Sequence, residues 1–424
     1  MSISRRNFLT SSAAVIAAGS MASRRVFGAN ERIQVGSAGL NGRGWSLAKA
    51  AMARDDTEVV ALCDVDKRVL ENRAKEVESM TGKRPATYVD YRDMVAAEGI
   101  DAITVGTPNH WHVLCGIWAM ENGKDVYIEK PISHTIWEGR QLVAAQKKYG
   151  RVAQHGTQRR SEPAYQRIAE RARSGIIGDI YMLRSGVSRF REAFNYPPQE
   201  DPPEWLDWPL WQGPAPERPF SRNYVHYNWH WFWHYGNGET GNNGPHRMDM
   251  INWIIDKGLP VKTHSSGGIF GYTVDARQTP NTQTITHTFA DGTLLHFDVR
   301  NRYTDSLPFV MAYGDQGYMN GSTFYGKDEK VIPDDKPAPE KVNSTQTHMD
   351  GFIEAVKKGD PDAVPATVEQ GHIAAALCHL GNIAYRLGRT VRFDPETETF
   401  PGDDEANALL TREYREGFEV PELA

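Results

Sequence analysis

The chain has 424 residues, a formal net charge of -6 and a pI near 6.2. This length exceeds that of most single cores, so we expect two domains, and the mildly acidic balance gives no reason to expect nucleic acid or an anionic membrane as a partner. The three cysteines lie far apart in apolar segments and predict neither a disulfide framework nor a metal site.

The N-terminal segment has the pattern of a twin-arginine export signal. Arg5 and Arg6 precede Phe8 and Leu9, and a short run of small apolar residues follows at 13–19. That run is too short to cross a bilayer as a helix, so we expect no stable membrane insertion. We therefore expect residues 1–30 to lie outside the fold and the protein to be periplasmic. The twin-arginine route carries folded proteins, which suits a protein that binds a cofactor before export.

A strand, a glycine-rich turn and a helix open the fold. Residues 32–36 are apolar enough for a buried strand, and residues 45–53 have helical spacing. The turn between them predicts a dinucleotide-binding site. Its candidate cofactor-binding residues are Gly39, Asn41, Gly42, Arg43 and Gly44. Asn41 stands where a second glycine is usual, and asparagine tolerates a left-handed backbone better than most residues.

A second apolar strand, 58–63, ends in Asp64, about twenty residues past the glycine turn. A carboxylate there accepts hydrogen bonds from the adenosine ribose and repels a 2'-phosphate, which favours NAD over NADP. Arg68 nearby leaves NADP possible. Asp64 also suits the first turn of the helix expected over 67–77, and the two roles are compatible.

The alternation of strands and helices continues to residue 155. We expect strands at 86–89, 101–106, 125–129 and 151–155, with helices at 92–97, 113–121 and 136–149. This order predicts a doubly wound parallel sheet, with a dinucleotide-binding domain over 31–153 and a second domain over 154–424. Candidate cofactor residues follow two strands: Thr107, Pro108, Asn109 and His112 after one, and Glu129 and Lys130 after the next.

Lys130 ends an apolar strand directly before Pro131. The carboxyl ends of parallel strands face the ligand crevice of such sheets, so Lys130 is a catalytic candidate. The alternative is a solvated lysine at a strand end.

The second half predicts an α+β domain with an open, mostly antiparallel sheet. After a helix at 162–173 and a strand at 179–187, we expect strands at 261–271, 282–289, 293–301, 309–313 and 317–323. Helices at 345–358 and 367–387 end at Gly359 and Gly388. The tail to residue 424 carries no readable chemistry.

A proline-rich and aromatic excursion interrupts this domain. Residues 197–219 hold eight of the 24 prolines, so no regular element is expected there, and residues 205–235 hold six of the eleven tryptophans. Such a group of rings is a subunit contact, a platform for sugar rings or a structural cluster. On the second of these interpretations Trp231 and Tyr235 are candidate substrate residues.

A glycine-rich run at 236–244 leads to Pro245 and His246. Pro245 suits a first helical turn, so we expect a helix over 246–257 with His246 at its start. A helix N-terminus opposes the imidazolium form, lowers its pKa and leaves a neutral ring that accepts a proton. The alternative is a histidine satisfied by a backbone carbonyl. Asn242 and Asp249 flank His246 as candidate substrate residues.

Taken together, these motifs resemble the Gfo/Idh/MocA family of NAD(P)-dependent oxidoreductases, over about residues 32–394. The resemblance rests on four motifs: the 39–44 turn, the Thr107-Pro108-Asn109 turn, Glu129-Lys130-Pro131 and the glycine-rich run 236–244 before His246. The resemblance implies that Lys130 and His246 flank the nicotinamide and the substrate carbon. Many members have an aspartate four residues before the histidine, where this chain has Asn242, so the proton-relay role of that aspartate is not carried over.

The implied reaction is hydride transfer between a secondary carbinol and NAD, with a general base for the hydroxyl proton. We expect His246 to be the base and Lys130 to orient the oxygen, and the reverse assignment stays open. Export favours a redox-neutral cycle with a retained cofactor, because no pool outside the cytoplasm recycles NADH.

Three functions fit. The first is an oxidoreductase acting on a sugar, glycoside or cyclitol. The second is an NAD-dependent glycosidase or lyase that oxidises its substrate transiently at C3, although glycosidase members tend to lack the lysine. The third is a non-catalytic nucleotide-binding protein. The resemblance also implies a homo-oligomer.

Overall fold

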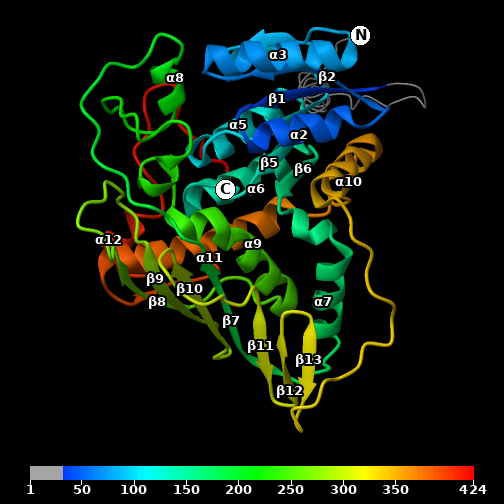
Figure 1. Cartoon of the computed structure of the whole chain (residues 1–424), viewed down its shortest axis with the longest axis vertical. Helices are drawn as coiled ribbons and strands as arrows, with labels where there is room; N and C mark the ends of the chain where they lie inside the picture. The colour runs from blue at the N-terminus through cyan, green and yellow to red at the C-terminus, as the bar shows by residue number, and fades with distance from the viewer. Residues whose placement is uncertain (1–31) are drawn as a thin grey trace, which may run out of the picture.

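The computed structural model of the protein describes residues 32–424 and contains two β-sheets, with the long helices α9 (Gly238–Ile255) and α11 (Val368–Leu387) between them (Figure 1). The six-stranded sheet lies in the upper half of the figure and the eight-stranded sheet in the lower half. This confirms the predicted fold class. The predicted export signal lies outside the described residues. Within residues 32–424, no helix is both long and apolar enough to cross a membrane.

The six-stranded sheet is parallel throughout, in the order β3-β2-β1-β4-β5-β6. Its strands are β1 (Ile33–Ala38), β2 (Thr57–Cys63), β3 (Ala86–Tyr88), β4 (Ala102–Val105), β5 (Asp125–Glu129) and β6 (Ala153–Gly156). The chain winds outward from β1 in one direction to β3 and in the other from β4 to β6. The reversal between β1 and β4 opens a crevice at the carboxyl ends of these strands.

Five helices connect these strands: α2 (Arg43–Met52), α3 (Lys67–Thr81), α4 (Tyr91–Ala96), α5 (His112–Glu121) and α6 (Ile136–Tyr149). Asp66 caps α3 by accepting a hydrogen bond from the Arg68 amide, and Thr135 caps α6 in the same way. Gly82 and Gly150 end these two helices with left-handed backbone. Side-chain caps therefore fix where α3 and α6 begin, and left-handed glycines fix where they end.

The second sheet has the order β13-β12-β11-β7-β10-β9-β8-β14, and all of its pairs are antiparallel except β7 with β10. Its strands are β7 (Ile180–Ser188), β8 (Lys262–Gly268), β9 (Thr282–Thr288), β10 (Leu294–Arg300), β11 (Met311–Gly314), β12 (Gly317–Asn320), β13 (Thr323–Gly326) and β14 (Val391–Arg392). One prediction was wrong here: the strand expected over 317–323 is a hairpin, because Gly321 turns the chain with a φ of 58°.

Two helices tie the second half of the chain to the first, α10 (Ser344–Lys358) and α11, while α7 (Pro163–Arg173) packs against α9. Helix α10 places Phe352 and Ile353 in one core with Ile33 and Val35 of β1. Helices α10 and α11 end at Gly359 and Gly388, as predicted. Helix α10 thus belongs to the core of the parallel sheet, although it lies in the part of the chain that we expected to form the second domain, after residue 153.

The aromatic excursion packs as a small core of its own. Leu206, Trp208, Trp211, Phe220 and Tyr235 are buried together in it. It contains the short helix α8 (Trp208–Gln212) and the 3₁₀ turn η3 (Asn228–Trp231). The expectation of no regular element was wrong for α8, because the Asp207 side chain caps it and a proline in its first turn suits helical geometry. A last short helix, α12 (Asp404–Asn407), precedes the tail.

Candidate functional site

A cavity of about 420 Å³ lies at the carboxyl ends of the parallel strands. One wall comes from the glycine turn, the end of β2, the turn after β4 and the end of β5. The opposite wall comes from the aromatic excursion, through residues 210–211 and 226–230. Most of the cofactor residues predicted from the sequence line this cavity: Gly39, Asn41, Gly42, Arg43, Asp64, Thr107, Pro108, Asn109, His112, Glu129 and Lys130.

The glycine turn fits a pyrophosphate. A Cβ atom on Gly44 would lie 1.7 Å from the Gly39 carbonyl oxygen, and one on Gly39 would lie 2.6 Å from the Thr107 nitrogen. Both positions therefore need glycine, because backbone occupies the space. Gly42 differs: it has a φ of 70°, and a Cβ there would meet no protein atom within 4 Å. Gly42 precedes α2 without a side-chain cap, so free amides face open space, as an anion site at a helix start requires.

Asp64 lines the cavity at the end of β2, where the sequence predicts a contact with the adenosine ribose. Its carboxylate accepts hydrogen bonds from the backbone amides of Leu40, at 2.7 Å, and Asp66, at 2.9 Å. These bonds fix the carboxylate beside the glycine turn, and burial raises its pKa. The first-turn role considered for Asp64 belongs to Asp66, whose side chain caps α3. Asp64 is thereby left to face the cavity.

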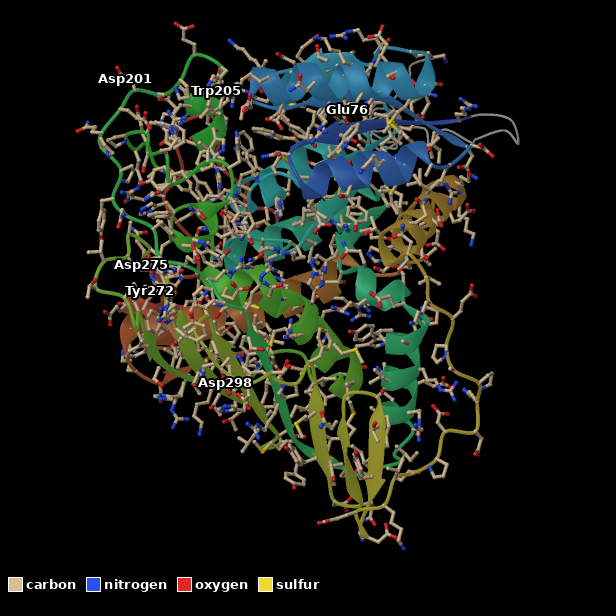
Figure 2. All side chains as sticks on the ribbon, viewed as in Figure 1. Glu76, Asp201, Trp205, Tyr272, Asp275 and Asp298 are labelled. Atoms are coloured by element: carbon tan, nitrogen blue, oxygen red, sulfur yellow. The ribbon has the colours of Figure 1, made fainter. Side chains whose placement is uncertain are left out.

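The excursion is fastened to the protein at this same end. The Lys67 amide donates to the Trp205 carbonyl at 2.9 Å, and the Asp207 amide donates to the Val65 carbonyl at 3.0 Å. The Arg68 guanidinium lies 3.4 Å from the centre of the Trp205 ring. Figure 2 shows Trp205 where the excursion meets the N-terminal domain. The segment therefore closes over the cavity beside Asp64.

Two residues hold the turn after β4 in place. The Asn109 side chain donates to the Asn237 side-chain oxygen at 3.1 Å, across to the start of α9. The ring of His112 lies 2.8 Å from the Thr107 carbonyl oxygen and 2.6 Å from that of Pro131. His112 thus links the turn after β4 to the turn after β5, and burial lowers its pKa.

Glu129 is buried at the end of β5 and organises the floor of the cavity. Its carboxylate accepts from the Arg43 guanidinium at 2.7 Å and from the Gln158 amide at 2.9 Å. Arg43 in turn donates to Thr345 of α10 at 2.8 Å. The Arg43 side chain is therefore committed to Glu129 and α10, while its backbone opens helix α2 at the glycine turn.

Lys130 follows β5, three strands across the sheet from β2, which ends beside Asp64. Its ammonium donates to the backbone carbonyl of Asn242, at 2.6 Å, and to the side-chain oxygen of Asn242, at 3.2 Å. Burial lowers the pKa of Lys130, while Glu129 and Glu239 oppose that shift. The Lys130 side chain is only partly exposed and is hydrogen-bonded to α9 rather than freely solvated, and its catalytic role stays a prediction. Asn242 also lines the cavity and approaches the Tyr227 hydroxyl at 3.5 Å.

His246 lies one turn beyond Asn242 on α9, and its predicted position in the helix was wrong. Helix α9 begins at Gly238, so Pro245 is inside it and His246 is in its third turn. The pKa of His246 is well below 6.5, but the causes are burial, Lys130 and Arg159 rather than a helix N-terminus. Its buried Nδ1 has no hydrogen-bond partner among residues 32–424.

Models of one family match both halves of the chain. An "oxidoreductase family, NAD-binding Rossmann fold" model matches residues 33–157. The model of the family's "C-terminal alpha/beta domain" matches residues 190–420, which is more than half of the chain. The chain belongs to the Gfo/Idh/MocA oxidoreductase family. Its first domain is an NAD-binding Rossmann domain, and the cradle at Gly42 and the carboxylate of Asp64 fit that cofactor.

Curated relatives match part of the chain only. A glycosyl hydrolase family 109 protein of Stenotrophomonas maltophilia is 29% identical over 192 residues, which is 43% of this chain and 41% of that protein. One of Shewanella baltica is 30% identical over 115 residues, or 26% of this chain and 25% of that protein. The match thus spans less than half the length of these relatives.

Solved structures share the fold over most of the chain. GenD2 from gentamicin A biosynthesis, solved with NAD, is 18% identical, with a TM-score of 0.64 over 87% of this chain and 99% of its own. The WlbA dehydrogenase of Bordetella pertussis, solved with NADH and UDP-GlcNAcA, is 19% identical, with a TM-score of 0.63 over 86% of this chain and 99% of its own. At these identities the similarity shows the family fold alone.

Three predicted substrate residues do not line the cavity. Asp249 is buried, and both of its oxygens accept from the Arg160 guanidinium at 2.9 Å, so it forms a structural ion pair. Tyr235 is fully buried among the rings of the excursion. Trp231 is also buried and stacks near Arg191 at 5.1 Å. Burial leaves these side chains little surface for a substrate, and the excursion is in the first place a structural cluster.

Sequence patterns missed several residues near Lys130. Tyr227 and His230 of the excursion line the cavity, and Arg191 pairs with the buried Glu239 at 2.9 Å. Tyr227, His230 and Arg191 come from segments without the hydrophobic periodicity of an α-helix or a strand. The aromatic run close to the glycine-rich approach was the available signal, but it did not distinguish cavity-lining rings from buried ones.

Proposed function

We propose that this protein is an NAD-dependent oxidoreductase that acts at a secondary hydroxyl of a sugar, glycoside or cyclitol. The observation that carries the proposal is the arrangement of one cavity, with Asp64 at the end of β2 and Lys130, bound to Asn242, after β5. This arrangement provides an acid for the ribose and an ionisable amine in one dinucleotide site. NAD, when bound, supplies hydride acceptance and return beside Lys130.

We assign the proton transfer to Lys130, which reverses the preferred assignment from the sequence. A general base works best with a pKa near the working pH. Burial moves the pKa of Lys130 down from 10.5 toward that range, whereas it moves the pKa of His246 down from 6.5 and away from it. Neutral His246 is therefore a weak base, suited to holding the substrate oxygen by a hydrogen bond. Asn242 orients the Lys130 amine.

Retention of the cofactor is part of the proposal. The excursion forms the wall of the cavity opposite the glycine turn and is fastened beside Asp64, so it would cover part of a bound dinucleotide. A twin-arginine route to the periplasm agrees with this arrangement, because a cofactor bound before export would stay with the enzyme. A redox-neutral cycle between two carbonyl compounds would follow.

The first experiment is to purify the protein without added nucleotide, denature it and quantify the released small molecules by mass spectrometry. We expect close to one NAD per chain, and sugars added to the native protein should change absorbance near 340 nm. Absence of nucleotide together with reversible NAD binding would indicate an exchanging dehydrogenase. Failure to bind NAD at all would contradict the proposed function.

A second candidate is a glycosidase that oxidises its substrate transiently and restores it. The similarity to glycosyl hydrolase family 109 proteins favours it. Release of a free sugar from a glycoside without net NADH would support this candidate over the oxidoreductase. The presence of Lys130 weighs toward the oxidoreductase, because glycosidase members tend to lack this lysine.

A further inference from the structure

Two arginines beside His246 share one aromatic ring. The guanidinium of Arg159, in the 3₁₀ turn η2 (Gln158–Ser161), lies 4.5 Å from the centre of the Phe309 ring. The guanidinium of Arg247, on α9, lies 4.8 Å from the centre of the same ring. Both side chains are partly exposed. Two like charges so close together repel, and each raises the free energy of the other.

No acid fully compensates this pair. Within residues 32–424, Arg247 forms no ion pair, and its Nε donates to the Gly186 carbonyl at 2.6 Å. Burial and then Arg159 lower the pKa of Arg247 to about 10, with partial opposition from Glu239. Glu239 is already paired with Arg191 at 2.9 Å. Among the described residues, Glu162 is the one acid that Arg159 pairs with, at 4.0 Å and one turn along the chain, and its guanidinium also donates to the Tyr165 hydroxyl.

The arginine pair is next to the proposed reaction centre. After burial, Lys130 and Arg159 are the two largest causes of the low pKa of His246, and Arg247 contributes as well. Arg247 directly follows His246 on α9, and its guanidinium approaches the carbonyl oxygen of Asn243, the neighbour of Asn242, at 3.5 Å. A substrate held by Lys130 and His246 at its reacting carbon would extend toward Arg159 and Arg247.

We propose that Arg159 and Arg247 form a subsite for an anionic group, and that the substrate is an acidic saccharide with a carboxylate next to the sugar ring. This inference rests on the proposed function and specifies its substrate class. A carboxylate between the guanidiniums would relieve their repulsion and accept charge-assisted hydrogen bonds from them. Phe309 would pack against the adjoining C–H groups.

An anionic substrate would also offset an excess of positive charge around the site. Arg43 pairs with Glu129 and Arg160 with Asp249, and the remaining cations outnumber the remaining acids. Those cations are Lys130, Arg159, Arg191 and Arg247, and besides Glu129, which is already paired with Arg43, the acids acting on them are Glu162 and Glu239. An acidic substrate would restore the balance as it binds.

The test compares matched sugars on NAD-loaded protein by isothermal titration calorimetry. D-glucuronate and D-galacturonate should bind at least about tenfold more tightly than D-glucose and D-galactose. Arg247→Gln and Arg159→Gln should each remove that preference. Arg173→Gln, which loses an exposed arginine paired with Asp256, should keep it and serves as the control.

The outcomes separate the two proposals. Equal binding of acidic and neutral sugars, with oxidation of either, would overturn the anion subsite and leave the oxidoreductase standing. Binding of acidic sugars that is unchanged in both glutamine variants would also overturn the subsite. A preference for uronates without any change at 340 nm would keep the subsite and contradict the oxidoreductase. Circular dichroism of each variant checks that it is folded.

Discussion

At the residue scale, burial decides which group can exchange a proton. Burial destabilises the charged forms of Lys130 and His246, so the pKa of each falls. The ordinary pKa values are 10.5 for lysine and 6.5 for histidine. A lower pKa therefore moves Lys130 toward pH 7 and moves His246 further below pH 7. Desolvation therefore distinguishes two residues that sequence motifs could only name together.

Removal of the Lys130 amine tests this assignment. Lys130→Met keeps the length of the side chain and removes the charge, so we expect turnover to fall by at least about a hundredfold because the base is lost. His246→Gln keeps a hydrogen-bonding group and should lose less. Steady-state kinetics measure both, and a fall of less than tenfold in Lys130→Met would contradict the role.

The pH dependence gives an independent measurement. A base must be neutral to act, so kcat/KM should rise with pH through a pKa that lies below 10.5, the ordinary lysine value. The rise should persist in His246→Gln and disappear in Lys130→Met. If His246 were the base, the rise would lie below pH 6.5 and would disappear in His246→Gln instead.

At the element scale, α9 connects the site to the core. Its early start at Gly238 brings Asn242 against Lys130, and the same helix carries His246 and, one turn later, Asp249. Asn242 and His246 are four residues apart and share one face of the helix. Asp249, seven residues beyond Asn242, is on the same face about two turns along the helix, where it meets Arg160. Position along the helix, rather than its face, therefore separates Asp249 from Asn242 at the cavity.

The buried Arg160–Asp249 pair should matter for stability. Asp249→Ala leaves the Arg160 charge buried without a partner, which costs about 3–5 kcal/mol in the free energy of unfolding. Asp201→Ala, at an exposed position of the excursion, is the control and should change it by less than about 0.5 kcal/mol. Denaturant unfolding measures both. Normal stability with lost substrate binding in Asp249→Ala would restore its predicted substrate role.

The excursion should control how fast NAD leaves. Trp205→Ala removes the ring that stacks on Arg68 and loosens the attachment beside Asp64, so we expect NAD to dissociate at least about tenfold faster. Tyr196→Ala changes a ring of the same segment that is 72% exposed and should leave the rate unchanged. Stopped-flow displacement of NAD measures the rates, and equal rates in the two variants would contradict the covering role.

At the scale of the whole molecule, the C-terminal tail returns to the first domain. Arg412 pairs with the buried Glu138 of α6 at 2.7 Å, and the Tyr414 hydroxyl donates to the same carboxylate at 2.9 Å. Phe418 packs edge-on against Trp111, which lines the cofactor cavity. A segment without readable chemistry thus supports the wall of the site.

Removal of residues 411–424 should lower both stability and cofactor affinity. Glu138 would be left buried without either partner, and Trp111 would lose its contact with Phe418. We expect Tm to fall by several degrees and NAD to bind more weakly. Differential scanning calorimetry with and without NAD measures both effects. An unchanged Tm would show that the tail is not part of the folded unit. The expected homo-oligomer stays a prediction for light scattering.

Local signals in the sequence were sufficient for the alternating strands and helices, the glycine turn, Asp64, the strand that ends in Lys130 and the family resemblance. Hydrophobic period, glycine turns and strand ends are set by neighbours along the chain, so they can be read without a structure. The expected helix over 246–257 failed at its start because Pro245 was interpreted as a first-turn residue.

Tertiary structure alone decided which polar residues face the cavity. Asp249 and Tyr235 lie close in sequence to Asn242 and His246, yet contacts with Arg160 and with the excursion bury them. Asn242, Arg43 and Phe309 contact Lys130, Glu129 and Arg159, respectively, from segments more than 80 residues away. Burial and charge compensation depend on such distant contacts, and for that reason the proton assignment and the arginine pair emerge only when the chain is folded.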